Sequence, residues 1–211
     1  MYAELNAVIC SGARRGLQQT YALLEERAPD ARDLPREEAL AELARRYFTS
    51  HGPATAKDFA TWASLTLAEV KASVEAAGSS LRREEIGGVA FWSGAVQPAR
   101  TPALRPPAVR LLQGYDDYIM GYTETKHLLA RPGTAWSPAT PPVFALVVLL
   151  DGHVAGFWKR TVKREEVIVE AALLEPFGAA QLQALEDEAV RYGAFLGLEA
   201  TVTLLPPGGR G

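Results

Sequence analysis

The sequence predicts an α+β protein: a winged helix-turn-helix, preceded by a partial second wing, and a C-terminal antiparallel β-rich domain with one long helix. Three observations predict it. Three helical patterns lie between residues 36 and 77, a hairpin pattern follows them directly, and strand patterns dominate the second half. The expected domains are a partial winged helix over 1–34, the winged helix-turn-helix over 35–93, a linker over 94–108 and the α+β domain over 109–211.

Capping signals and helical spacing mark the three helices. The first begins at Pro35-Arg36-Glu37-Glu38, where proline and acids suit a first turn, and His51-Gly52-Pro53 ends it. The second begins with Thr55 and Asp58 and turns Phe59 and Trp62 inward. The third has a capping box at Thr66 and Glu69, ends at Gly78, and buries a stripe of Leu67, Val70, Val74 and Ala77.

Two hairpin patterns predict the wings. Ser80–Ile86, the turn Gly87-Gly88 and Val89–Trp92 follow the third helix, which would enter the major groove. Ala7–Ser11 and Gln18–Leu24 form a similar hairpin without helices before it. A lone hairpin is marginal in water, so we expect that its helices lie upstream, in which case this chain is a fragment, or that it docks on the next domain.

The C-terminal half reads as a meander, a long helix and a last strand. Strands are expected at Val109–Leu112, Val143–Leu150, Val154–Val162, Glu166–Leu174 and Glu199–Leu205. The helix, Ala179–Leu196, has apolar residues at Leu182, Leu185, Ala189, Tyr192 and Phe195. Thr134–Pro142 reads as a proline-punctuated loop, and Gly114–Tyr122 fits no single pattern.

Bulk properties narrow the class of protein. A net charge of −3 means that any DNA-binding charge must be local. The longest apolar run, Val143–Leu150, is too short to span a membrane and no signal peptide is evident, so we expect a cytoplasmic protein. One cysteine excludes an internal disulfide, and the scattered His51, His127 and His153 do not suggest a metal site. We expect no metal and no cofactor.

Several motifs carry a resemblance to a known family. They are Ala3-Glu4-Leu5 with Ile9–Gly12, Thr20–Leu24, the run from Arg46 through Ser50-His51-Gly52-Pro53-Ala54-Thr55 to Trp62, and Tyr115-Asp116-Asp117-Tyr118 with Gly121-Tyr122. Over nearly the whole chain, they resemble the winged-helix DNA-binding proteins that include bacterial interstrand-crosslink DNA glycosylases. The chain is similar to the central and C-terminal part of that family.

The resemblance implies tandem winged helices and the removal of bulky alkylated bases by cleavage of the N-glycosidic bond. In the glycosylases the catalytic element is a Gln-x-Gln or Gln-x-Asp motif near the start of the full-length protein, a region without counterpart here. Gln18-Gln19 lacks that spacing, and Gln181-x-Gln183 lies on a late helix, so neither is assigned a catalytic role. Family membership does not by itself establish an enzyme.

Candidate DNA contacts are polar or cationic residues at helix starts, exposed helix faces and hairpin turns. They are Arg14, Arg15, Thr55, Lys57, Lys71, Ser73, Arg82, Arg83, Lys159, Arg160, Lys163 and Arg164. Each alone also reads as a solvated surface residue. The third helix carries Glu69 and Glu75 beside Lys71 and has no Arg or Asn for base edges, so we expect recognition of the backbone or shape of double-stranded DNA.

A possible lesion pocket is formed by the paired acids and their aromatic neighbours, Tyr115, Asp116, Asp117 and Tyr118. The alternative, which we favour, is that the acids shape a turn and cap the next segment while the tyrosines pack between domains. His51 could approach a phosphate, but a turn histidine bonded to backbone is favoured.

The sequence therefore favours a DNA-gripping portion of a glycosylase-like repair protein that acts on alkylated or crosslinked bases. Two alternatives stay open: a non-catalytic winged-helix DNA-binding protein, and a winged helix that serves as a protein-interaction module. The oligomeric state is left open.

Overall fold

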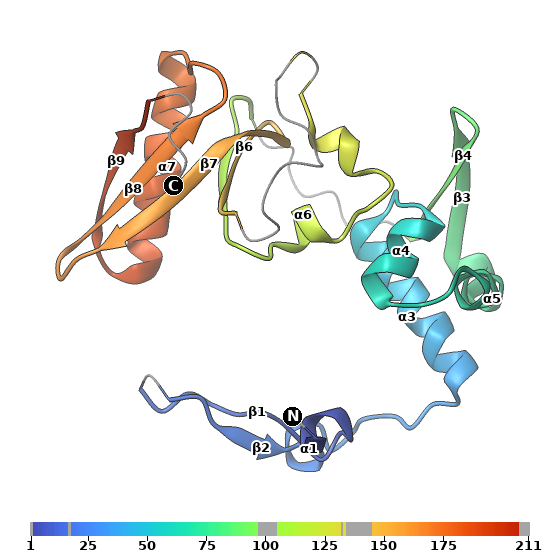
Figure 1. Cartoon of the computed structure of the whole chain (residues 1–211). Coiled ribbons are helices and arrows are strands. Elements are labelled where there is room, and N and C mark those ends of the chain that lie inside the picture. The colour runs from blue at the N-terminus through green and yellow to red at the C-terminus, as the bar shows by residue number, and fades with distance from the viewer. Residues whose placement is uncertain (1, 17, 97–104, 132, 134–144, 207–211) are drawn as a thin grey trace. The chain divides into compact units, whose positions relative to one another are not determined.

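The computed structural model describes residues 2–16, 18–96, 105–131, 133 and 145–206 (Figure 1). It is a mixed α+β structure that divides into two compact units, residues 1–39 and 40–211. Within the described residues, none of the helices is both long and apolar enough to cross a membrane. The expected loop at Thr134–Pro142 lies outside the described residues.

The first unit holds a small antiparallel hairpin between two short helices. Strands β1 (Ile9–Ser11) and β2 (Tyr21–Leu23) pair with Ile9 opposite Leu23. Helix α1 (Tyr2–Leu5) precedes them and α2 (Leu24–Arg27) follows. The hairpin is confirmed, but its second strand is shorter than expected, because Gln18 pairs only with Arg15 in an isolated bridge within the turn.

Three helices and a hairpin open the second part of the chain. The helices are α3 (Arg36–His51), α4 (Ala56–Ala63) and α5 (Leu67–Ala77). Both expected capping boxes are present, since Thr55 exchanges hydrogen bonds with Asp58 and Thr66 with Glu69. Ser64 closes α4 in the left-handed conformation, with φ of 53°, and thereby turns the chain into α5.

The core of these helices is aromatic. Tyr47 and Phe48 of α3 pack edge-to-face, and Phe59 of α4 contacts both rings. Val70 and Val74 of α5 complete the cluster. Leu67, expected in the buried stripe, is 55% exposed, because as the first residue of α5 it lies over an open groove along α4 rather than over this core.

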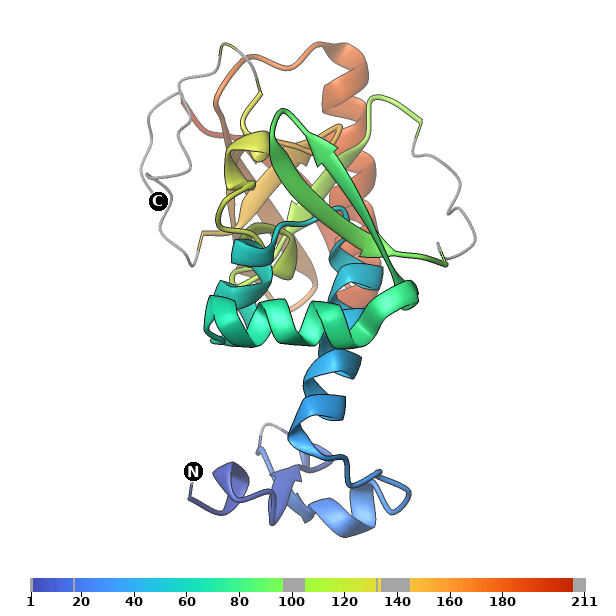
Figure 2. The ribbon, with the colours of Figure 1, turned by 90° about the vertical axis from the view of Figure 1, so that its right-hand side faces the viewer.

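Strands β3 (Leu81–Ile86) and β4 (Val89–Gly94) form the expected hairpin, which follows α5 after the 3₁₀ turn η1 (Gly78–Ser80) (Figure 2). Gly87 and Gly88 both have positive φ, as a two-residue hairpin turn requires. Trp92 of β4 pairs with Ala54 through two backbone hydrogen bonds. The base of the hairpin is thus fixed to the start of α4.

The C-terminal part is a five-stranded sheet in the order β5-β6-β7-β8-β9. The strands are β5 (Val109–Leu112), β6 (Val147–Leu150), β7 (His153–Val162), β8 (Glu166–Leu173) and β9 (Glu199–Leu204). The first four are antiparallel, which confirms the expected meander, whereas β9 runs parallel to β8. The expected start of β6 at residues 143–144 lies outside the described residues.

Helix α7 (Ala179–Leu196) covers one face of the sheet, and its Leu185 and Ala189 join a core with Val148, Trp158 and Val169. Its buried stripe passes through Leu185, Ala189 and Gly193. Phe195, expected on the apolar face, is 84% exposed. It follows Gly193 by two residues, about 200° around the helix, and therefore points away from the sheet.

The segment that fitted no pattern forms one turn of helix α6 (Asp117–Met120) and the 3₁₀ helix η2 (Lys126–Leu129). Ile119 and Leu129 are buried against Val147, Leu149 and Val154 on the face of the sheet opposite α7. This segment therefore covers one side of the sheet, and it also bonds to α3 and α4.

Candidate nucleic-acid interface

The carboxylate of Asp58, in the first turn of α4, accepts six hydrogen bonds. It is fully buried, and one carboxylate oxygen accepts the backbone N–H groups of Thr123, Glu124 and Thr125 at 2.7, 2.7 and 3.3 Å. The other accepts the backbone N–H and hydroxyl of Thr55 and the hydroxyl of Thr125, each at 3.0 Å. We call this group, Asp58 with Thr55 and residues 123–125, the Asp58 cradle.

The cradle keeps the carboxylate charged. Burial alone would raise the pKa of Asp58, but the hydrogen bonds from Thr55, Thr123, Glu124 and Thr125 outweigh burial and lower the pKa below its usual value. The negative charge at the start of α4 also interacts favourably with the positive end of the helix dipole. The cradle thus clamps residues 123–125 onto the first turn of α4.

Asp117 makes a second link beside the cradle. One oxygen lies 2.7 Å from Nε2 of His51, at the end of α3, and the other accepts the indole N–H of Trp62 in α4 at 3.1 Å. Nδ1 of His51 lies 2.8 Å from the hydroxyl oxygen of Ser50. We call His51, Trp62 and Asp117 the Asp117 bridge. His51 therefore bonds side chains, not the backbone partners favoured from the sequence.

Tyrosines surround the bridge. Tyr47 stacks on His51 and donates its hydroxyl to the carbonyl of Gly121 at 2.9 Å, while Tyr122 donates to the carbonyl of His51 at 2.9 Å. Burial, together with nearby acids, raises the pKa of both phenols. A Cβ at Gly121 would lie 2.6 Å from the carbonyl oxygen of Asp117 and 3.0 Å from the ring of His51. Glycine at this position therefore lets the backbone of residue 121 pack closely against Asp117 and His51.

The four residues of the expected lesion pocket occupy different environments. Asp116 caps α6 by accepting the backbone N–H of Tyr118 at 3.0 Å. The hydroxyl of Tyr118 donates to the carbonyl of Gly152 at 3.0 Å, in the turn between β6 and β7. Tyr115 is exposed, and Asp117 belongs to the bridge. The pocket assignment stays a prediction.

The candidate contacts at the start of α4 are already engaged. Thr55 is buried in the cradle. Lys57 is exposed but lies 2.6 Å from the carboxylate of Glu124, and this ion pair raises the pKa of Lys57 and lowers that of Glu124. A phosphate at this helix end would have to displace Glu124.

On α5, Lys71 and Ser73 differ. Lys71 is exposed and lies 3.9 Å from Glu75, one turn away. Ser73 was expected to face outward, but it is 2% exposed and donates its hydroxyl to the carbonyl of Val70 at 2.8 Å. Ser73 faces inward because it lies on the same side of α5 as Val70 and Val74. It is therefore absent from the exposed surface of α5.

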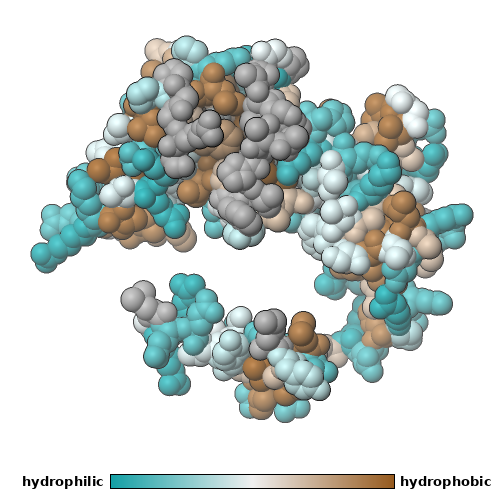
Figure 3. Space-filling model, in the orientation of Figure 1, coloured by the Kyte–Doolittle hydropathy of each residue, from teal (hydrophilic) through white to brown (hydrophobic). Residues whose placement is uncertain are grey.

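Both hairpins of the N-terminal half carry arginines. Arg82 and Arg83 lie in β3, and each forms an ion pair with the acid two residues on, Glu84 at 2.9 Å and Glu85 at 3.2 Å. They lie toward the base of the hairpin. Its tip is apolar, with exposed Ile86 and Val89, as Figure 3 also shows. Arg14 and Arg15 are exposed in the β1–β2 turn of the first unit.

The β7–β8 hairpin carries the remaining four cations. Lys159 pairs with Glu170 at 3.5 Å, and Lys163 pairs with Glu166 at 2.7 Å. The guanidinium of Arg160 lies 5.8 Å from the ring centre of Tyr192 on α7. Arg164 is exposed in the turn. Acids therefore accompany most of the candidate cations, and the local positive field is weaker than the cations alone suggest.

Comparison with known proteins adds to this geometry. Residues 1–195 match the family model of AlkZ-like DNA glycosylases. The chain belongs to the AlkZ-like DNA glycosylase family. Among solved structures it is similar to the Streptomyces sahachiroi DNA glycosylase AlkZ, with 22% sequence identity and a TM-score of 0.65 over 94% of this chain. No curated protein matches it.

The structural likeness covers 55% of the Streptomyces chain, so this AlkZ-like chain spans about half the length of that relative. The family resemblance inferred from the motifs is confirmed. At this level of identity the structural likeness concerns the fold. In the part of the AlkZ-like chain that the structure describes, no cluster of three or more histidine, cysteine or acidic side chains could hold a metal ion. The expectation that no metal is bound stays a prediction.

Sequence reasoning missed the partners of the two acids in this AlkZ-like chain. Asp58 was expected to cap α4, which it does, but residues 65 to 67 positions further on supply four of its donors. Asp117 was considered only with its sequence neighbours. The two family motifs held a usable signal. Buried polar groups need hydrogen-bond partners, so polar residues at the start of a helix and in a distant aromatic loop can bond to one another.

Proposed function

We propose that this chain is the DNA-gripping part of a glycosylase-like repair protein that acts on alkylated or crosslinked bases. In this proposal α3–α5 and β3–β4 act as a winged helix-turn-helix, with α5 directed toward the groove and β3–β4 as its wing. The observation that carries the proposal is the order of three helices, two of them with capping boxes, and a hairpin within a DNA glycosylase family.

The surface chemistry favours contact with the phosphate backbone. Glu69, Lys71 and Glu75 stand along α5, and a helix with this balance of charge offers little to base edges. In the two β-hairpins of the second unit, Arg82, Arg83 and Lys163 are exposed and form ion pairs with nearby glutamates. Phosphates can compete for such cations, because an exposed ion pair contributes little stability. We expect duplex DNA to be bound by backbone and shape.

The test is equilibrium binding of the whole chain to matched duplexes, one undamaged and one carrying an N7-alkylated guanine, across a series of salt concentrations. The proposal predicts binding at low salt that weakens steeply as salt rises, with tighter binding to the alkylated duplex. No binding to either duplex at low salt would refute it. The variant Lys71→Ala should reduce the salt slope by about one.

The same experiment separates the alternatives. Equal affinity for both duplexes would favour a non-catalytic DNA-binding protein. The acids beside the cations support the third reading, a protein-interaction module, since they reduce the positive field that DNA requires. That reading predicts no salt-dependent DNA binding at all.

A further inference from the structure

The outer edge of β9 is open. In the order β5-β6-β7-β8-β9, no strand of the described chain pairs with the far side of β9, which lies at the end of the sheet (Figure 1). The other edge strand, β5, is buried or half-buried throughout, whereas four of the six residues of β9 are exposed. An open edge presents unpaired backbone N–H and C=O groups and is a template for another strand.

The register identifies which backbone groups are free. The N–H groups of Glu199 and Leu205 donate to β8, at Glu165 and Ala171. Because alternate residues of a parallel strand bond to the same neighbour, the odd-numbered residues of β9 face β8. The N–H and C=O groups of Ala200, Val202 and Leu204 therefore point outward from the sheet.

β9 lacks the features that usually protect an edge. It contains no proline and no lysine, it pairs with β8 without a bulge, and its side chains include the β-branched Thr201, Val202 and Thr203. Its only charge is Glu199, at its first position. The edge is regular over its whole length.

We propose that β9 pairs antiparallel with β9 of a second copy of this chain, around a two-fold axis at Val202. In that register Val202 faces its own copy and Ala200 faces Leu204, so the outward groups form about six hydrogen bonds. The two Glu199 carboxylates lie at opposite ends of the paired strands, about 20 Å apart. Self-pairing thus satisfies every outward group and separates the only like charges of the strand.

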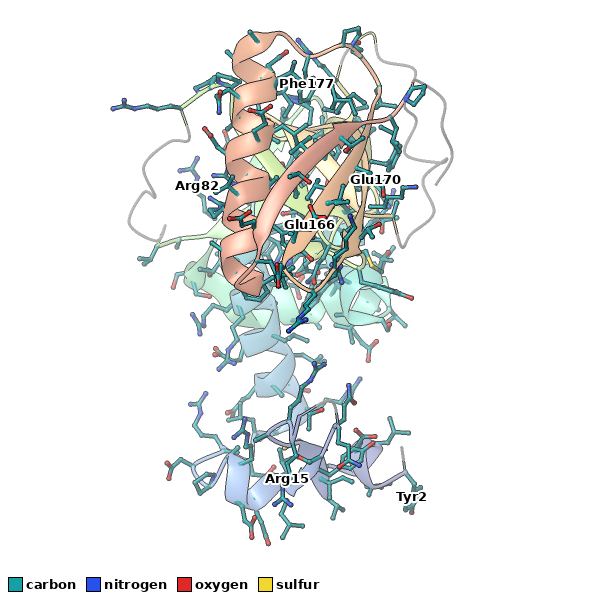
Figure 4. The ribbon with its side chains drawn as sticks, turned by 90° about the vertical axis from the view of Figure 1, so that its left-hand side faces the viewer. Tyr2, Arg15, Arg82, Glu166, Glu170 and Phe177 are labelled. Carbon is teal, nitrogen blue, oxygen red and sulfur yellow. The ribbon has the colours of Figure 1, made fainter. Side chains whose placement is uncertain are left out.

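Helix α7 supplies an apolar flank to the same interface. Tyr192 of α7 contacts Trp158 in β7, whereas Gly193 lies against Ala200 of β9, which fixes the side of α7 that faces the edge. Val190 lies on that side and is 60% exposed. A two-fold axis perpendicular to the sheet places both α7 helices on one face, so each Val190 points toward the other copy. Figure 4 shows α7 and the outer strands from this side.

The first measurement is the mass of the whole chain in solution, by light scattering or sedimentation over a range of micromolar concentrations. We expect twice the chain mass of 22.8 kDa at the upper end and a fall toward the single-chain mass on dilution. A single-chain mass at all concentrations would overturn the proposal and leave the edge to a different partner.

Two variants locate the interface. Leu204→Pro removes an outward N–H at a position where an edge strand tolerates proline, and two bonds per dimer are lost, so the dimer dissociation constant should rise about tenfold. Val190→Glu places like charges near the axis and should also weaken the dimer.

The matched control is Phe195→Glu, a change to the same residue at a more exposed apolar position on the side of α7 away from β9. It should leave the dimer intact. Circular dichroism of each variant checks that the fold is retained. A dimer weakened as strongly by Phe195→Glu as by Val190→Glu would contradict this interface, as would a dimer that is indifferent to Leu204→Pro in a folded chain.

Discussion

Two aspartates hold the segment of residues 115–125 on α3 and α4, and they do so in opposite environments. The Asp58 cradle is buried and saturates one carboxylate with six hydrogen bonds. In the Asp117 bridge, the carboxylate of Asp117 is 57% exposed and makes two hydrogen bonds. The two carboxylates therefore contribute different amounts to the free energy of unfolding, because water can replace the partners of Asp117 but cannot reach those of Asp58.

The largest effect is expected from Asp58→Ala. It leaves several neutral donors of Thr55 and residues 123–125 without an acceptor, each at a cost of about 1–3 kcal/mol where buried, so the free energy of unfolding should fall by about 3–5 kcal/mol. Urea unfolding, followed by circular dichroism, measures it. A loss below about 1 kcal/mol would mean that the cradle adds no more than an exposed link.

The stabilisation that the Asp58 cradle contributes should be lost at low pH. The folded-state pKa of Asp58 is lower than its usual value of 3.8, so its contribution is present above that value and is lost as pH falls through the folded pKa. As the pH falls from about 5 to about 2, the free energy of unfolding of the wild type should fall by more than that of Asp58→Asn, which cannot titrate at this position.

This comparison with Asp58→Asn cancels the other carboxyls. Glu42 is one of them, because hydrogen bonds from Arg45 and Arg46 lower its pKa to about 2. Parallel pH profiles of the two proteins would show that the charge of Asp58 does not stabilise the fold.

A smaller loss is expected from Asp117→Ala, which removes the acceptor of both His51 and Trp62. Because the carboxylate of Asp117 is largely exposed, the free energy of unfolding should fall by about 1 kcal/mol. Trp62→Phe removes the indole N–H donor and also part of the ring that packs on Tyr47 and Phe59, so its cost combines one lost hydrogen bond with lost packing. A cost for Asp117→Ala that equals that of Asp58→Ala would remove the contrast between the two sites.

The smallest effect is expected at two exposed ion pairs, Arg82–Glu84 and Arg83–Glu85. The double variant Glu84→Gln with Glu85→Gln releases Arg82 and Arg83 and should change the unfolding free energy by less than about 0.5 kcal/mol. If the proposed DNA binding is correct, duplex affinity should rise a few-fold at low salt. Glu37→Gln, on α3 and outside the candidate contacts, is the control. Unchanged affinity would exclude the β3–β4 hairpin from the DNA contact.

Local chemistry made much of the fold predictable. The capping pairs Thr55–Asp58 and Thr66–Glu69, the Gly87-Gly88 turn and the β6–β8 meander depend on residues close in sequence, and all are present. The motif from Arg46 to Trp62, with the Tyr115–Tyr122 motif, also led to the family, which the comparisons show.

Periodicity misplaced the side chains at the ends and margins of elements. Leu67 and Phe195 both fit an apolar stripe, yet each lies where the neighbouring element no longer covers the helix. Ser73 is the converse, a polar residue on a buried side that bonds its own helix. Apolar periodicity shows which residues share one side of a helix, but it does not show how much of that side a neighbouring element covers.

The sequence by itself determined α3, α4, α5 and α7 and the hairpins, because capping, turn geometry and alternation act over a few residues. Its motifs also indicated the family. Tertiary structure alone decided the partners of Asp117 and those of Asp58 other than Thr55, since these partners are 55–67 residues away along the chain. It also decided that β9 runs parallel to β8 and ends the sheet with an open edge. Every residue except proline has the same backbone N–H and C=O groups, so only the assembled sheet shows which of these groups remain available.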